Sequence, residues 1–144
     1  QTGQDAAAFW EIRDAVSEVL PLLGSVSNQD VSLPIGLIGQ FVEAVKAKLQ
    51  SKYCNVNMMF FGHIGDNNLH AFAYTGRAED TDKINHDIMY MIGEFGGAIT
   101  AEHGVGTLKK KYLALSRTEN EIQLMKTLKT AMDPKGLLNP GRVF

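Results

Sequence analysis

The feature that most constrains the fold is a pair of short apolar segments on either side of a polar turn. Segments 55–61 and 69–75 are rich in apolar and aromatic residues, and segment 62–68 between them holds two glycines, an aspartate and two asparagines. Apolar runs that flank such turn residues predict a β-hairpin. A sheet with one apolar face needs helices to cover it, so the rest of the chain must supply them.

Helical periodicity on both sides of the hairpin supplies these helices. The spacing of apolar residues predicts helices over 5–20, 37–49, 80–95 and 118–132, a lysine-rich helical turn over 107–114, and a further strand over 26–33. Thr118 and Glu121 have the spacing of a capping box at the start of the last helix, which Pro134 ends. The buried stripe of that helix is expected to be Ile122, Met125, Leu128 and Met132. The pattern predicts a single α+β domain over 1–144, an antiparallel sheet covered on one face by helices, with a helical C-terminal part.

Charge and composition exclude several classes of protein. Sixteen acidic and fourteen basic residues give a net charge of −2, which argues against nucleic-acid binding because that function normally brings a basic excess. No apolar run approaches the roughly 20 residues of a transmembrane helix. A single cysteine, Cys54, permits no internal disulfide. Because the chain begins at Gln1 with no leader, we expect a fragment or a processed product.

Three histidines lie in segments that are not plain core. His63 and His70 bracket the hairpin turn, so antiparallel pairing brings their imidazoles to one end of the sheet, and Glu102 with His103 follows in a glycine-rich loop. Two imidazoles and a carboxylate are typical ligands of a catalytic divalent metal. The alternative is that His63 and His70 cap a turn and that Glu102 is a solvated acid paired with Lys109 or Lys110.

Three motifs, in this order and spacing, carry a resemblance to a known family. The motifs are GHIGDNNLH at 62–70, GAITAEHGVG at 97–106, and DP at 133–134 with LNPGRVF at 138–144. The chain resembles the C-terminal domain of FAD-linked oxidases, a family that includes D-lactate dehydrogenase, the glycolate oxidase flavin subunit and D-2-hydroxyglutarate dehydrogenase. The resemblance implies a ferredoxin-like cap domain whose N-terminal FAD-binding domain is absent here. It also implies oxidation of a D-2-hydroxy acid to the 2-oxo acid, with hydride transfer to FAD.

The resemblance also implies a role for individual residues. His63, His70 and Glu102 would hold a divalent metal, with zinc expected and manganese, iron or cobalt as alternatives. His103 would be the catalytic base that takes the hydroxyl proton of the substrate.

Further residues are matched to substrate and flavin by the same resemblance. Arg13 and Ser17 would bind the substrate, while Glu102 and Asn139 would contact the flavin cofactor. Taken alone, Arg13 is equally well explained as a surface charge paired with Asp14 or Glu11, and Asn139 as part of a turn.

Three positions depart from the family pattern. Asn67 replaces a glycine found in many relatives, and asparagine tolerates the left-handed backbone better than most residues. Asn28 and Phe72 replace a lysine and a polar residue of hydroxyglutarate-type members. Because both changes remove contacts to a second carboxylate, we expect a monocarboxylic substrate of the lactate or glycolate type.

Two alternatives remain open. The chain could be a non-catalytic dimerisation or partner-docking module that keeps the fold, in which case the four site side chains diverge. It could also be a free-standing metal hydrolase, although the C-terminal motif would then be unexplained. For the leading hypothesis we expect an electron acceptor that reoxidises FAD, a cytoplasmic location with membrane contact only through that acceptor, and a homodimer formed by an exposed sheet edge.

Overall fold

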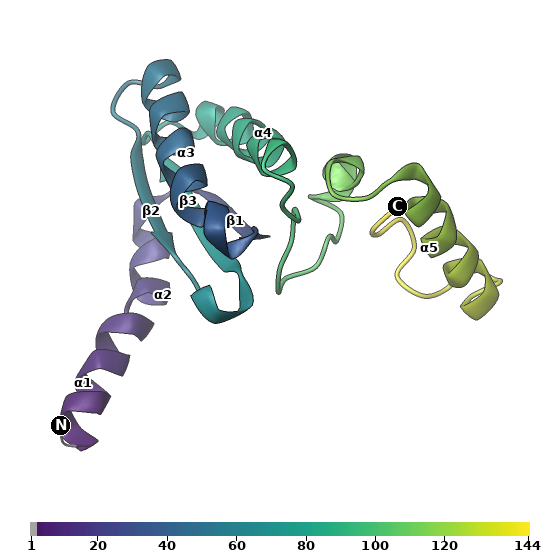
Figure 1. Ribbon diagram of the computed structural model, residues 1–144, viewed down its shortest axis with the longest axis horizontal. Helices are drawn as coiled ribbons and strands as arrows, with labels where there is room; N and C mark the ends of the chain where they lie inside the picture. The colour runs from purple at the N-terminus through teal and green to yellow at the C-terminus, as the bar shows by residue number, and fades with distance from the viewer. Residues whose placement is uncertain (1–2) are drawn as a thin grey trace.

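The structure is a computed structural model that describes residues 3–144, apart from the side chains of Ser17 and Ile64. Its centre is a three-stranded antiparallel sheet of β1 (Ser27–Ser32), β2 (Asn57–Phe61) and β3 (Asn68–Tyr74), in the order β1-β3-β2 (Figure 1). The predicted hairpin is the pair β2 and β3, in which Phe61 lies opposite His70. The predicted α+β class is confirmed, and β1 and β2 form the two edges of the sheet.

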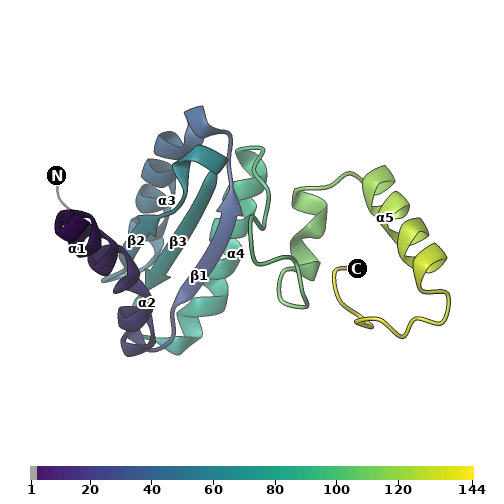
Figure 2. The same ribbon diagram turned by 90° about the horizontal axis from the view of Figure 1, so that it is seen from below.

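Two helices, α3 (Ile38–Lys52) and α4 (Ala78–Glu94), cover one face of the sheet (Figure 2). Their apolar stripes are buried, as the periodicity predicts, and they pack on Val31, Leu69 and Ala73 of the sheet. The buried helix residues include Phe41, Val45 and Leu49 of α3 and Ile84, Ile88 and Ile92 of α4. This layer is the hydrophobic core, and it fixes the sheet from one side only.

The opposite face of the sheet carries a row of polar and aromatic side chains. Side chains alternate between the two faces along a strand, so the neighbours of Leu69 in β3, Asn68 and His70, point away from the core. The register places Asp30 of β1 opposite His70 and Asn28 opposite Phe72. Directly paired residues share a face. The strands therefore bring Asp30, His70 and Phe61 into one row across the sheet.

The N-terminal segment is broken into two helices rather than the single helix predicted over 5–20. Helix α1 (Gly3–Asp14) is followed by α2 (Val16–Val19) and a 3-10 turn (Leu20–Leu23) that contains Pro21. Helix α1 extends past the edge of the sheet, so Phe9, Trp10 and Ile12 are exposed (Figure 1). Only its last turn and α2 lie beside the sheet.

The last helix, α5 (Glu119–Met132), forms where predicted, but its predicted burial is wrong. The capping box is present, since Thr118 accepts a hydrogen bond from the Glu121 N–H and Glu121 accepts one from the Thr118 N–H. Leu128 and Met132 are nevertheless 54% and 82% exposed. The helix lies away from the sheet (Figure 1), and the other two residues of the predicted stripe, Ile122 and Met125, are only half-buried.

The segment between the core and α5 is mostly loop. The lysine-rich turn predicted over 107–114 is a 3-10 helix, η4 (Lys110–Leu115), which packs on α4 through Tyr112.

No helix in the described part of the chain combines the length and the apolar character that a membrane span requires.

Candidate functional site

The turn between β2 and β3 holds His63 in a defined position. Asn67 adopts the left-handed conformation expected at this position, with φ +65°. Its neighbour Asn68 accepts a hydrogen bond from the His63 N–H at Oδ1 (3.3 Å) and donates its own N–H to Asp66 (3.2 Å). The rings of His63 and His70 are 6.5 Å apart, so the hairpin brings the two imidazoles together as predicted.

Loop 97–106 returns to the same end of the sheet. Its start is fixed to β1, because Ala98 and Ser32 exchange backbone hydrogen bonds of 2.8 and 3.1 Å. Glu102 then lies between the two histidines, with Oε1 2.9 Å from His63 Nδ1 and Oε2 3.7 Å from His70 Nε2. The three predicted metal ligands therefore converge, with the carboxylate between the two imidazoles.

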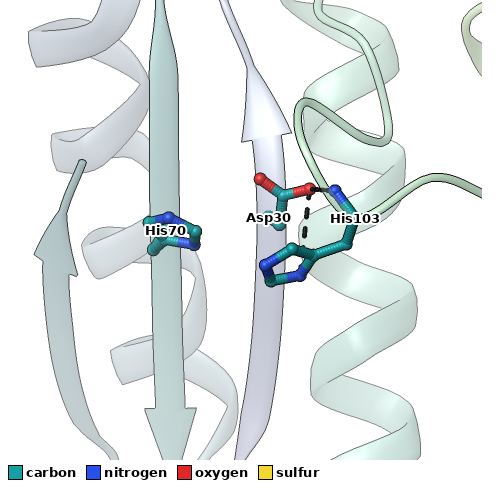
Figure 3. Close-up of side chains that lie close together, drawn as sticks. All are labelled: Asp30, His70 and His103. Atoms are coloured by element: carbon teal, nitrogen blue, oxygen red, sulfur yellow. Dashed lines mark hydrogen bonds and ion pairs between the residues drawn. The ribbon is translucent and has the colours of Figure 1, made fainter. Parts of the chain in front are cut away.

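His103 follows Glu102 on the same loop and lies beside β1 and β3. Its ring is 5.7 Å from the ring of His70, and its Nδ1 is 3.9 Å from Oδ2 of Asp30. Figure 3 shows these three side chains together, each from a different segment of the chain. The side chain of His103 is 59% exposed, so the imidazole is accessible to a substrate.

The residue that sequence reasoning missed is Asp30. Its carboxylate is buried, and Oδ2 accepts hydrogen bonds from the backbone N–H groups of Ala101 (3.1 Å), Glu102 (2.9 Å) and His103 (2.9 Å). Aspartate is rare inside strands, so its position in the predicted strand 26–33 was a usable signal. Its partners could not be foreseen, because they lie about 70 residues away.

The surroundings shift the pKa values of two site residues. Burial raises the pKa of Asp30, but the backbone donors of the loop and the nearby Lys109 outweigh this effect and leave the pKa lowered. Burial lowers the pKa of His70, an effect that the charges of Asp30 and Glu102 only partly oppose. His70 is therefore neutral near pH 7, the form in which an imidazole binds a metal.

Arg13 from α1 reaches the same site. One guanidinium nitrogen is 3.0 Å from His63 Nε2, and the other pairs with Asp14 at 3.0 Å. Because arginine only donates, this contact requires His63 to accept at Nε2, so its proton lies on Nδ1, toward Glu102. Binding of a metal by His63 would therefore require one of these two contacts to be released. The contact to Asp14 agrees with the surface-charge interpretation, while the contact to His63 places Arg13 in the site.

Of the two other predicted residues, the structure describes only the side chain of Asn139. The side chain of Ser17, the second predicted substrate contact, lies outside the described residues. Asn139 is exposed in the tail after α5. The tail and α5 both lie on the other side of the molecule from α1 (Figure 2). The tail is fixed instead by a hydrogen bond from the Val143 N–H to the Gly106 carbonyl (2.9 Å).

A pocket of about 180 Å³ opens between α1, α2 and the uncovered face of the sheet. Phe61 and Phe72 stack in its wall, with ring centroids 5.1 Å apart and 9° between the ring planes. The other lining residues are Arg13, Asp14, Val16, Leu20, Asn28, His70 and His103. The pocket thus combines an apolar wall with one guanidinium and two imidazoles.

The donor atoms at this end of the sheet fit a divalent transition metal. Imidazole nitrogens with a carboxylate suit zinc, manganese, iron or cobalt. Two separate groups have ligand atoms within 4.8 Å of one another, one formed by Asp30, His70 and His103 and one by His63, Asp66 and Glu102. The predicted ligands are divided between them, with His63 and Glu102 in one group and His70 in the other. Asp30 is a poor ligand, because it is buried and both of its oxygens already accept hydrogen bonds.

The chain is similar to known proteins over nearly its whole length. A family model described as FAD linked oxidases, C-terminal domain, matches residues 1–143. The chain is 34% identical to D-2-hydroxyglutarate dehydrogenase of Stutzerimonas stutzeri and 35% identical to glycolate oxidase subunit GlcD of Bacillus subtilis, in each case over 100% of this chain and 32% of the relative. It is 36% identical to the mitochondrial D-2-hydroxyglutarate dehydrogenase of Arabidopsis thaliana, over 96% of this chain and 25% of that protein. The chain spans a quarter to a third of the length of these relatives.

Proposed function

The chain belongs to the family of FAD linked oxidases, C-terminal domain, and on that premise we propose that it is the substrate- and metal-binding domain of an FAD-dependent dehydrogenase. The reaction is the oxidation of a D-2-hydroxy acid to the 2-oxo acid. The observation that carries this proposal is the position of Glu102 between His63 and His70, with Arg13 and His103 beside them. The names of the relatives, which are enzymes of hydroxyglutarate and glycolate, support the same reaction class.

Each residue has a part in this chemistry. His63, His70 and Glu102 would hold the divalent metal, with zinc expected, and the bound metal would supply Lewis-acid polarisation of the substrate hydroxyl and carboxylate. His103 takes the hydroxyl proton, because it is the exposed imidazole next to His70 and is not needed as a ligand. The hydrogen on the carbon that bears this hydroxyl leaves as a hydride, and FAD is its acceptor.

Arg13 would bind the carboxylate of the substrate. Its side chain is 54% exposed, lines the pocket and contacts the exposed Asp14 and His63. Exchange of Asp14 for a substrate carboxylate would preserve the charge balance and allow a bidentate pair. Ser17 and Asn139 stay predicted contacts to substrate and flavin.

The pocket wall favours a monocarboxylic substrate. Phe72 and Asn28 lie opposite each other in the register and both line the pocket. Arg13 is the only lysine or arginine among the described lining residues, so a second carboxylate would meet the Phe61–Phe72 stack without a cation. Burying an unpaired carboxylate there is costly.

The test is flavin reduction in the complete flavoprotein that contains this chain. Under anaerobic conditions, D-lactate or glycolate is expected to bleach the flavin absorbance, and the His103→Ala variant is expected to keep bound FAD but to react far more slowly. If none of D-lactate, glycolate and D-2-hydroxyglutarate reduces the flavin, the proposed function is wrong. If D-2-hydroxyglutarate is the best substrate, the monocarboxylic preference is wrong and the reaction class stands.

A further inference from the structure

We propose that Asp30 is the positioning residue of this site, a single buried carboxylate that holds the segments of His63, Glu102 and His103 beside His70. The inference rests on the proposed function for the roles of these four side chains. The contacts of Asp30 that carry it do not depend on those roles. They fall into three groups, one for each segment of the site.

The first group fixes loop 97–106. Oδ2 of Asp30 accepts the N–H groups of three consecutive residues, 101–103, and the Thr100 hydroxyl at 3.3 Å. Three successive N–H groups that converge on one oxygen define the local backbone, since each fixes the orientation of one peptide plane. The three peptide planes thus fixed include those that carry the N–H groups of Glu102 and His103.

The second group fixes the hairpin turn. Oδ1 of Asp30 accepts a hydrogen bond from Asn68 Nδ2 (2.9 Å), and this bond leaves Asn68 Oδ1 free to accept the His63 N–H (3.3 Å). The orientation of the Asn68 amide is therefore set by Asp30. If that amide turned over, its NH₂ group would face the His63 N–H, which would lose its acceptor, while the backbone bonds from Asp66 and Asn68 to the His63 carbonyl would remain.

The third group concerns the sheet itself. Asp30 lies opposite His70 in the register, so the position of His70 relative to the carboxylate is set by strand pairing. Lys109 donates from Nζ to the Asp30 carbonyl (2.7 Å), which fixes β1 at the same residue. One residue thus contacts or faces every segment that contributes a predicted ligand or base.

Only a carboxylate can make all these bonds at once. Asparagine has the same shape, but it offers one acceptor oxygen and one NH₂ group in place of two acceptors. In Asp30→Asn, the NH₂ group faces either the N–H groups of residues 101–103 or the NH₂ group of Asn68. The substitution therefore releases one segment without changing volume, and Asn68→Ala releases the turn alone.

The experiment compares Asp30→Asn and Asn68→Ala with a control, Asp87→Asn. Asp87 is also a buried carboxylate, but it binds Lys52 and Tyr53 at the other end of the sheet. Amide hydrogen exchange of the metal-free chain, measured residue by residue by NMR, is the first readout. We expect Asp30→Asn to speed exchange at residues 101–103 or at His63 by about tenfold or more. Asn68→Ala should affect His63 alone, and Asp87→Asn neither segment.

The second readout is titration with Co²⁺, whose d–d absorption reports ligand geometry. Asp30→Asn is expected to weaken Co²⁺ binding by about 10- to 100-fold and to change the spectrum. Asp87→Asn is expected to change neither. Co²⁺ binding by Asp30→Asn that equals that of the wild type, with the same spectrum, would overturn the proposal.

Three further outcomes decide the remaining cases. Unchanged exchange in Asp30→Asn, or equal effects of Asp30→Asn and Asp87→Asn on the site segments, would overturn the positioning role. If Asp30→Asn does not fold, faster exchange confined to His63 in Asn68→Ala supports the role and its absence overturns it. If the wild type binds no Co²⁺ while the exchange pattern is as expected, the metal part of the proposed function fails and the positioning role is supported.

Discussion

Gly62 gives the sharpest test of how tightly the hairpin turn is built. A Cβ at this position would lie 2.3 Å from the backbone oxygen of Asn68 and 3.0 Å from Asn68 Oδ1, the atom that accepts the His63 N–H. Ordinary carbon contacts lie near 3.5–4.0 Å, so the turn must open by roughly 1 Å to admit the methyl group. Overpacking of this kind costs about 1–3 kcal/mol, because the obstacle is backbone rather than a flexible side chain.

Gly65 is a matched control three residues away in the same turn. A Cβ at Gly65 meets nothing within 4 Å, and its backbone conformation suits other residues. We expect Gly62→Ala to lower Tm by roughly 3–10 °C in thermal unfolding. Gly65→Ala is expected to leave Tm unchanged or to raise it slightly, through the smaller entropy of the unfolded chain. Equal Tm values for the two variants would refute the close approach of Gly62 to Asn68, and with it the geometry that places His63.

Three other predictions concern the rest of the molecule. Trp10, the sole tryptophan, is 63% exposed, so its fluorescence should resemble that of tryptophan in water; a blue-shifted, unquenchable emission would contradict the position of α1. Phe41→Ala should cost about 3–5 kcal/mol in urea unfolding, because the ring is fully buried in the core; a loss below 1 kcal/mol would place it elsewhere. The pKa of Asp133 is lowered to about 2 by Lys129 and by the N–H groups of residues 137 and 138. Its stabilisation of the tail is thus complete above pH 4 and lost as pH falls toward 2, so amide exchange at 137 and 138 should accelerate there in the wild type but not in Asp133→Asn.

The hairpin and its neighbouring helices were predictable because their signals are local. The capping box of Thr118 and Glu121 and the turn residues around Asn67 each act within a few positions of the chain. His63 and His70 were brought together by the same hairpin, so part of the site followed from short-range rules. Local chemistry therefore accounts for the elements and for one pair of site residues.

What the sequence could not supply depends on contacts between distant segments. The bond between Asp30 and loop 97–106 joins residues about 70 positions apart, and no periodicity reports it. The predicted burial of the apolar stripe of α5 failed for a related reason. A helical period indicates which side of a helix is apolar, but not whether another element covers that side. Leu128 and Met132 keep the period and remain exposed.

The central claim, that His63, His70 and Glu102 form one metal site, is tested most directly by zinc binding to the chain. Equilibrium dialysis measures the zinc bound per chain in the wild type, in His70→Ala and in His86→Ala. The His86→Ala control removes an exposed imidazole on α4, away from the site. We expect about one zinc per chain in the wild type and in His86→Ala, and loss of that zinc in His70→Ala. Equal zinc binding by His70→Ala and the wild type, or no zinc in the wild type, would contradict the claim.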